Sequence, residues 1–118
     1  MAMIENGNMK SRLVDGVVVM TLLPSKIGEF EAPGISHDVE SLGKDHGWRM
    51  VMDLSRVALL GSRGIGMLLA LMKAAAANKG KLALCGLSDD LHQTLRVSAL
   101  TRLFTIKDDV EKAVAAVK

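Results

Sequence analysis

A chain of 118 residues, 49% of them hydrophobic, suits one domain with a real core and argues against intrinsic disorder. The net charge is only +2 with the basic residues spread along the chain, and aromatic residues make up 3%, which together argue against a nucleic-acid or membrane-binding surface. A single cysteine excludes an internal disulfide, and the lack of a signal-peptide pattern or of an apolar stretch of about 18 residues predicts a soluble cytoplasmic protein without a membrane span.

The chain is expected to begin with a β-hairpin. Residues 1–9 are predicted to be flexible, and residues 11–14 to form a short strand. Asp15-Gly16 is a strong signal for a two-residue hairpin turn. Residues 17–23 are nearly all apolar, which predicts a strand covered on both faces that ends at Pro24.

A loop or extended connection over residues 25–30 should lead into the first helix. Pro33 is suited to the first turn of a helix. Gly43 is expected to end this helix. Its inner face is marked by apolar residues at spacings of four and three: Ile35, Val39 and Leu42.

The middle of the chain predicts two more buried strands and the helices that follow them. Residues 48–54 and 81–85 are apolar runs of strand length. The first should be followed by a loop over residues 55–62 and a helix of about four turns that ends at residues 78–80. The second should be followed by a turn at Gly86 and a helix capped by Ser88, with two acidic residues in its first turn, Asp89 and Asp90.

The last two elements are expected to be a short strand and an amphipathic helix. Residues 103–106 predict the strand. Asp108 with Glu111 three residues later resembles a capping box. The helix that follows has apolar residues at i, i+3, i+4 and i+7, namely Val110, Ala113, Val114 and Val117.

This alternation of strands and helices predicts parallel strands joined by crossover helices. The expected fold class is α/β: a single-layer mixed sheet of about five strands, mostly parallel in the centre, with about four helices, in one domain over residues 1–118. Loops that follow parallel strands gather at the carboxyl edge of the sheet. Residues 55–62 and 86–88 should therefore be neighbours in space.

Residues 57–66 carry the most chemical information. An apolar run stops at Gly61, Ser62 follows, and an apolar helical segment begins at Met67, which predicts a loop, a helix N-cap and a helix. Ser62 could there accept a hydrogen bond from a free backbone N–H. A phosphate would also be favoured, because unpaired N–H groups and the helix dipole attract negative charge. Ser62 is therefore a candidate phosphorylation switch.

Four stretches stand out by their order and spacing: VMDLSRV at 51–57, SRGIGML at 62–68, GKLALCG at 80–86 and LRVSALTRLF at 95–104. With these stretches the chain, from residue 11 onward, resembles the STAS domain, the fold of bacterial anti-sigma-factor antagonists. There are two departures. The family usually has Asp-Ser-Ser-Gly or Asp-Ser-Ala-Gly where this chain has Gly61-Ser62-Arg63-Gly64. Residues 24–31 also look longer than the usual link into the first helix.

The resemblance implies a regulator of transcription that works by protein–protein binding, with no enzymatic activity and no cofactor. In such proteins the unphosphorylated form binds a serine-kinase-type anti-sigma factor. The kinase phosphorylates the serine that matches Ser62, the complex dissociates, and a metal-dependent serine phosphatase resets the protein. The partner-binding surface is expected to combine the start of the helix with the neighbouring loop, as Leu60, Gly61, Ser62, Arg63, Gly64, Met67, Gly86, Leu87 and Ser88.

Catalytic and nucleotide-binding motifs fit this region less well. A hydrolase elbow needs glycine two residues before the serine, whereas Gly61 directly precedes Ser62. No spacing places a histidine at that serine, and the three histidines are expected to be solvated: His37, His46 and His92. A P-loop would need Lys followed by Ser or Thr after Gly66, where Met67 stands.

Metal sites are not supported, because the histidines lack ligand spacing and there is one cysteine. Asp53, at the end of a strand, is expected to hydrogen-bond loop N–H groups, and Cys85 to be a small buried hydrophobe. One alternative of a different class stays open. It is a constitutive STAS interaction module in a larger assembly or transport-linked complex, with Ser62 only a helix N-cap.

Overall fold

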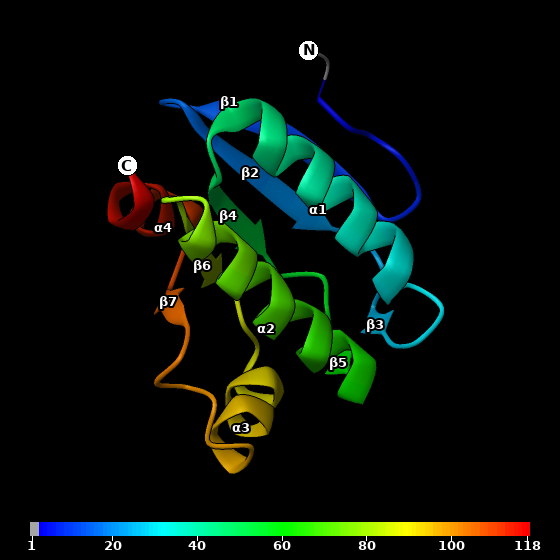
Figure 1. The fold of residues 1–118 in the computed structure, drawn as a ribbon. Helices are drawn as coiled ribbons and strands as arrows, with labels where there is room; N and C mark the ends of the chain where they lie inside the picture. The colour runs from blue at the N-terminus through cyan, green and yellow to red at the C-terminus, as the bar shows by residue number, and fades with distance from the viewer. Residues whose placement is uncertain (1–2) are drawn as a thin grey trace.

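A mixed five-stranded sheet forms the centre of the fold in a computed structural model that describes residues 3–118 (Figure 1). The first two strands are antiparallel, and each later strand is parallel to its neighbour. The predicted α/β class with a mixed sheet is confirmed. In spatial order the strands are β1 (Met9–Val14), β2 (Val17–Leu22), β4 (Arg49–Asp53), β6 (Lys81–Cys85) and β7 (Thr105–Lys107).

Helices cover both faces of the sheet (Figure 1). Successive side chains of a strand point to opposite faces. In β2, Val18 and Met20 belong to the core under α1 and α2, whereas Val17 and Val19 pack with α4. This two-sided burial is why β2 is almost wholly apolar. The four helices of the described part are α1 (Ala32–His46), α2 (Ser62–Ala77), α3 (Asp89–Val97) and α4 (Val110–Val117).

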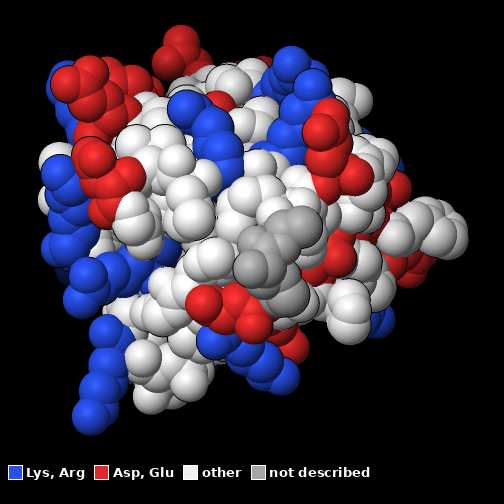
Figure 2. All heavy atoms as spheres, turned by 90° about the horizontal axis from the view of Figure 1, so that it is seen from above, with Lys and Arg blue, Asp and Glu red and all other residues white. Residues whose placement is uncertain are grey.

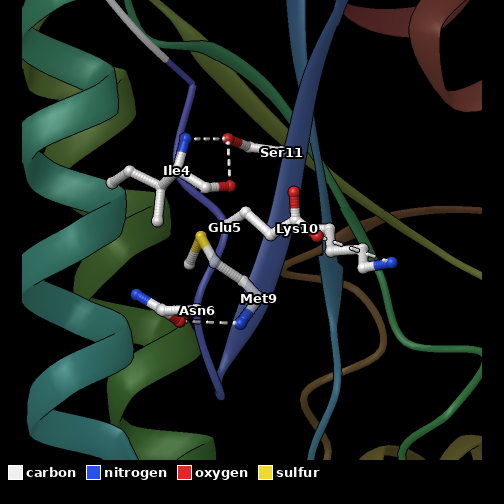
Figure 3. A network of polar contacts seen from close by, with 6 residues as sticks. All are labelled: Ile4, Glu5, Asn6, Met9, Lys10 and Ser11. Atoms are coloured by element: carbon white, nitrogen blue, oxygen red, sulfur yellow. Dashed lines mark hydrogen bonds and ion pairs between the residues drawn. The ribbon is translucent and has the colours of Figure 1, made fainter.

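The predicted hairpin is confirmed. Asp15 and Gly16 have φ values of 51° and 81°, and Val14 pairs with Val17 across the turn. Residues 1 and 2 of the expected flexible stretch lie outside the described residues. The remainder turns back on β1, where the Ile4 N–H donates to the Ser11 Oγ at 2.7 Å and the Ser11 hydroxyl donates to the Ile4 carbonyl at 3.0 Å (Figure 3).

The expected end of α1 at Gly43 is wrong. The helix continues to His46, and Gly47, with φ 73°, terminates it. Gly43 serves packing instead, because a Cβ there would lie 2.6 Å from the ring of Trp48. The absent side chain makes room for the buried indole of Trp48, which directly precedes β4.

The structure contains a second sheet, of two strands, in regions that were predicted to be loops or extended connections. β3 (Lys26–Ile27) and β5 (Leu59–Leu60) are parallel, with Lys26 opposite Leu59 and Ile27 opposite Leu60. This ribbon ties the segment before α1 to the segment before α2. It therefore fixes the start of both helices relative to each other (Figure 1).

Two C-terminal boundaries also differ from expectation. The last strand begins two residues later than predicted, at Thr105. The N-cap of α4 is Asp109 and not Asp108, because Asp109 has the extended backbone and its side chain accepts from the Lys112 N–H at 2.9 Å. Asp108 instead forms an exposed ion pair with the Lys112 Nζ at 3.5 Å.

Candidate protein-interaction site at the start of α2

Ser62 is exposed at the amino-terminal end of α2. Among residues 3–118, no hydrogen bond joins its hydroxyl to another group. Leu68 and Leu71, further along α2, are almost completely buried against the sheet. The helix is thus anchored in the core while its first residue faces solvent.

The predicted N-cap role of Ser62 is wrong by one residue. Gly61 is the N-cap: its backbone is extended, and its carbonyl accepts the first intrahelical hydrogen bond from the Ile65 N–H at 3.0 Å. Ser62 is the first helical residue. The N–H groups of Ser62, Arg63 and Gly64 precede that first bond, so they point outward as potential donors to an anion.

The ribbon of β3 and β5 sets the position of this helix end. The Gly61 N–H donates to the Ile27 carbonyl at 2.9 Å. Gly64 faces the same carbonyl so closely that a Cβ on it would lie 2.6 Å from the oxygen. Gly64 is therefore required for the close approach of α2 to β3. Gly66 has no such constraint, because nothing lies within 4 Å of its Cβ position.

The loops after β4 and β6 lie side by side, as predicted. The Leu54 N–H donates to the Cys85 carbonyl at 2.9 Å, and a Cβ on Gly86 would lie 3.1 Å from Ser55. Asp53 performs the predicted hydrogen-bonding role, since its Oδ1 accepts from the Ser55 N–H at 3.0 Å. These contacts hold the two loops together at the carboxyl edge of the sheet.

The nine residues predicted for partner binding divide into two groups by burial. Leu60, Gly64 and Met67 are buried, so their side chains shape the surface from beneath. The accessible members are Gly61, Ser62, Arg63, Gly86, Leu87 and Ser88, of which only Ser62, Arg63 and Ser88 are strongly exposed. Two exposed apolar residues lie outside the predicted set. Phe30 is 87% exposed and Leu59 is 51% exposed.

The charges at the start of α2 are unbalanced. Its first turn holds no acidic residue, whereas the first turn of α3 holds Asp89 and Asp90. Arg63 is exposed and forms no ion pair with the residues that the structure describes. Elsewhere basic and acidic side chains are interspersed, as on the face seen in Figure 2.

The cysteine and the histidines are the other candidate groups of the chain. Cys85 is fully buried in β6, and its pKa is raised to about 12, chiefly by burial and then by the carboxylates of Asp53 and Asp109. The thiol is therefore protonated at neutral pH, as expected of a core residue. His37 and His46 are on α1 and His92 is on α3; no hydrogen bond connects them to Ser62 within the described chain.

Comparison with known proteins gives a consistent result. The family model described as STAS domain matches residues 10–113. The structure of an anti-sigma factor antagonist from Mycobacterium paratuberculosis is 22% identical, with a TM-score of 0.81 over 92% of this chain and 92% of that chain. The Bacillus cell fate determinant SpoIIAA in its phosphorylated form is 18% identical, with a TM-score of 0.70 over 93% of this chain and 99% of that chain.

A similar fold also occurs inside a much larger protein. The murine anion transporter Slc26a9 is 14% identical over 91% of this chain, with a TM-score of 0.73, but only 18% of the transporter is covered. Identities this low show a shared fold. No helix in the described part of this chain combines the length and apolar character needed to span a membrane.

Proposed function

The chain belongs to the STAS domain family, and we propose that it is an anti-sigma-factor antagonist whose binding to a serine-kinase-type anti-sigma factor is switched by phosphorylation of Ser62. A metal-dependent serine phosphatase would restore the binding form. The observation that carries the proposal is the free, exposed hydroxyl of Ser62 at the first position of a helix that is otherwise anchored in the core.

Phosphorylation at this position should have little effect on the fold. A phosphate adds about −1.5 to −2 charges at neutral pH. At a helix N-terminus a favourable charge contributes about 0.3–1 kcal/mol, and no acidic residue occupies the first turn of α2 to oppose it. An added contact to Arg63 would contribute about 0–1 kcal/mol, because both groups are exposed.

The effect on a complex should be much larger. An unpaired charge buried in a desolvated interface costs about 2–5 kcal/mol, and each 1.4 kcal/mol is tenfold in affinity. This difference between a small effect on folding and a large effect on binding is what would make Ser62 a switch. The surface proposed for the partner comprises the accessible members of the predicted set around Ser62, with the buried members holding the backbone in place.

The proposal is tested by incubating the purified chain with each serine-kinase-type anti-sigma factor of its organism and ATP, followed by intact-mass measurement. We expect one added phosphate on the wild type and none on Ser62→Ala. Ser55→Ala is a matched control, because Ser55 is an exposed serine on the neighbouring loop. Phosphate on Ser62→Ala, or none on the wild type with any kinase, would reject the switch.

A second function is favoured by one observation, namely Gly61 in place of the acidic residue usual before this serine. If that substitution removes kinase recognition, the chain would be a constitutive interaction module of a larger assembly or transport-linked complex. The likeness to a domain of an anion transporter supports this alternative. It predicts partner binding that ATP and the kinase do not change.

A further inference from the structure

Phe30 is the most exposed of the large hydrophobic residues in the described chain. Its side chain is 87% exposed, whereas the other phenylalanine, Phe104, is 6% exposed. Exposure of a whole aromatic ring is unfavourable in water. Aromatic residues are enriched in protein–protein interfaces, where a few buried anchors supply most of the binding energy. A fully exposed ring in a chain with few aromatic residues is therefore a candidate anchor for a protein partner.

The segment that carries Phe30 is held by hydrogen bonds. The Gly28 N–H donates to the Glu31 Oε1 at 2.9 Å, and the Ala32 N–H donates to the Gly28 carbonyl at 3.0 Å. The preceding residue, Ile27, accepts from the Gly61 N–H at 2.9 Å. The backbone on each side of Phe30 is thus fixed before any partner binds, which lowers the entropy lost on binding.

The segments that carry Phe30 and Ser62 lie side by side, because a Cβ on Gly61 would lie 3.7 Å from the Gly28 Cα. A shallow cleft of about 180 Å³ lies between the starts of α1 and α2, lined by Glu29, Ala32, Pro33, Ser36, Arg63 and Met67. Glu29 is adjacent in sequence to Phe30, and Arg63 is adjacent to Ser62. A protein that covers this cleft would therefore lie beside both segments.

We infer that Phe30 is the apolar anchor of the docking surface that Ser62 switches, and that its occupant is the serine-kinase-type anti-sigma factor. This inference rests on the proposed function. The partner would supply an apolar pocket for the ring and an acidic group opposite Arg63, whose charge is unpaired within the described residues. The anti-sigma factor is favoured over a second copy of this chain, because the segment that carries Phe30 lies beside the serine that the kinase must reach.

The anchor also has a specific consequence for the kinase reaction. Phe30 touches none of the groups that would react, so its removal should weaken docking without slowing phosphate transfer in the complex. For Phe30→Ala we therefore expect KM for the antagonist to rise and kcat to stay the same. A residue needed only for folding would not separate the two constants in this way.

The experiment measures binding and phosphorylation of wild type, Phe30→Ala and Leu13→Ala by the purified anti-sigma factor that phosphorylates the wild type. Leu13 is a matched control, because it is 51% exposed on β1, away from the cleft. We expect Phe30→Ala to weaken binding roughly ten- to a hundredfold, the range supported by burial of one phenylalanine side chain. Leu13→Ala should bind like the wild type, and both variants should melt within a few degrees of it.

The outcomes separate this inference from the function on which it rests. Equal binding of Phe30→Ala and wild type would overturn the anchor alone. Failure of the wild type to bind any anti-sigma factor would overturn the proposed function and the anchor together. If sedimentation shows a wild-type dimer that Phe30→Ala dissociates, the occupant is a second copy and the inference is wrong.

Discussion

The starts of α2 and α3 lie at the same edge of the sheet and follow equivalent strands, yet they are built in opposite ways. At α3 the Ser88 Oγ accepts from the Leu91 N–H at 3.2 Å, and Asp89 and Asp90 complement the helix dipole. At α2 the N-cap is Gly61, which has no side chain, and no acidic residue follows. One helix end is closed by its own side chains, and the other is left open.

The difference shows how a serine near a helix start can serve either structure or regulation. A hydroxyl that caps a helix already accepts a backbone hydrogen bond, so a phosphate placed on it would have to take over that bond. The Ser62 hydroxyl is one position further into its helix and accepts no capping hydrogen bond from the described residues. A phosphate there would meet free N–H groups and cost the fold little.

The largest expected effect is on partner binding by Ser62→Asp. We expect at least about a thirtyfold loss of affinity for the anti-sigma factor, because an unpaired charge in an interface costs about 2–5 kcal/mol. Ser62→Asn is the control of similar shape without charge and should bind more tightly than Ser62→Asp. Titration calorimetry measures the affinity of the wild type, Ser62→Asp, Ser62→Asn and Ser62→Ala. Equal affinities of Ser62→Asp and Ser62→Ala would contradict the switch.

The next effect concerns the two glycines of the first turns of α2. Gly64→Ala should lower the free energy of unfolding by about 1–3 kcal/mol, because its Cβ would lie 2.6 Å from the Ile27 carbonyl and α2 would have to shift. Gly66→Ala should raise it by about 0.5–1 kcal/mol, since its position is open and alanine favours helix. Urea unfolding measures both. Similar values for the two variants would show that α2 does not need its close contact with β3.

Removal of each serine hydroxyl tests the comparison directly. Ser88→Ala should lower the free energy of unfolding by about 1 kcal/mol, the usual cost of a lost N-cap. Ser62→Ala should change it by only a few tenths of that amount, because no hydrogen bond to the described residues is lost. Thermal and urea unfolding of both variants provide the test. A loss at Ser62 as large as that at Ser88 would mean that Ser62 caps its helix after all.

The elements predicted correctly are those fixed by local pattern. The apolar runs of β4 and β6, the Asp15-Gly16 turn and the Ser88 cap each follow from residues adjacent in sequence. The ribbon of Lys26–Ile27 with Leu59–Leu60 could not be predicted from local pattern. Strands of two residues show no periodicity, and each depends on a partner more than 30 residues away in the chain. The wrong end for α1 has a different cause. The chain offers two glycines close together, Gly43 and Gly47, and the sequence does not show that Gly43 makes room for Trp48 while Gly47 ends the helix.

The start of α2 was predicted to within one residue. The order of Gly61 and Ser62 locates the helix start, but the residue that caps it is decided by where the backbone turns from extended to helical. The exposure of Phe30 could not be predicted, because sequence alone does not show which phenylalanine of the two is left outside the core. Buried members of the predicted set, such as Met67, were included for the same reason.

The smallest expected effect is that of Gly61→Asp, which would give the start of α2 a side-chain cap. Gly61 has φ −76°, which any residue can adopt, and a Cβ there would lie 3.6 Å from the Ile27 carbonyl, an ordinary contact. Gly61→Asp should therefore fold normally and raise the free energy of unfolding by a few tenths to about 1 kcal/mol, because aspartate caps a helix and complements its dipole.

Gly61→Asp also tests recognition by the kinase, because it restores the acidic residue that usually precedes the serine. If Gly61 limits kinase recognition, Gly61→Asp should be phosphorylated faster than the wild type, as measured by intact mass over time. Gly61→Asn is the neutral control, since asparagine caps a helix about as well as aspartate. Faster phosphorylation of both variants would assign the effect to the cap, whereas a gain for Gly61→Asp alone would assign it to charge. A slower reaction of Gly61→Asp would mean that the kinase reads this helix end in its uncapped, uncharged form, and that Gly61 is itself part of the recognition.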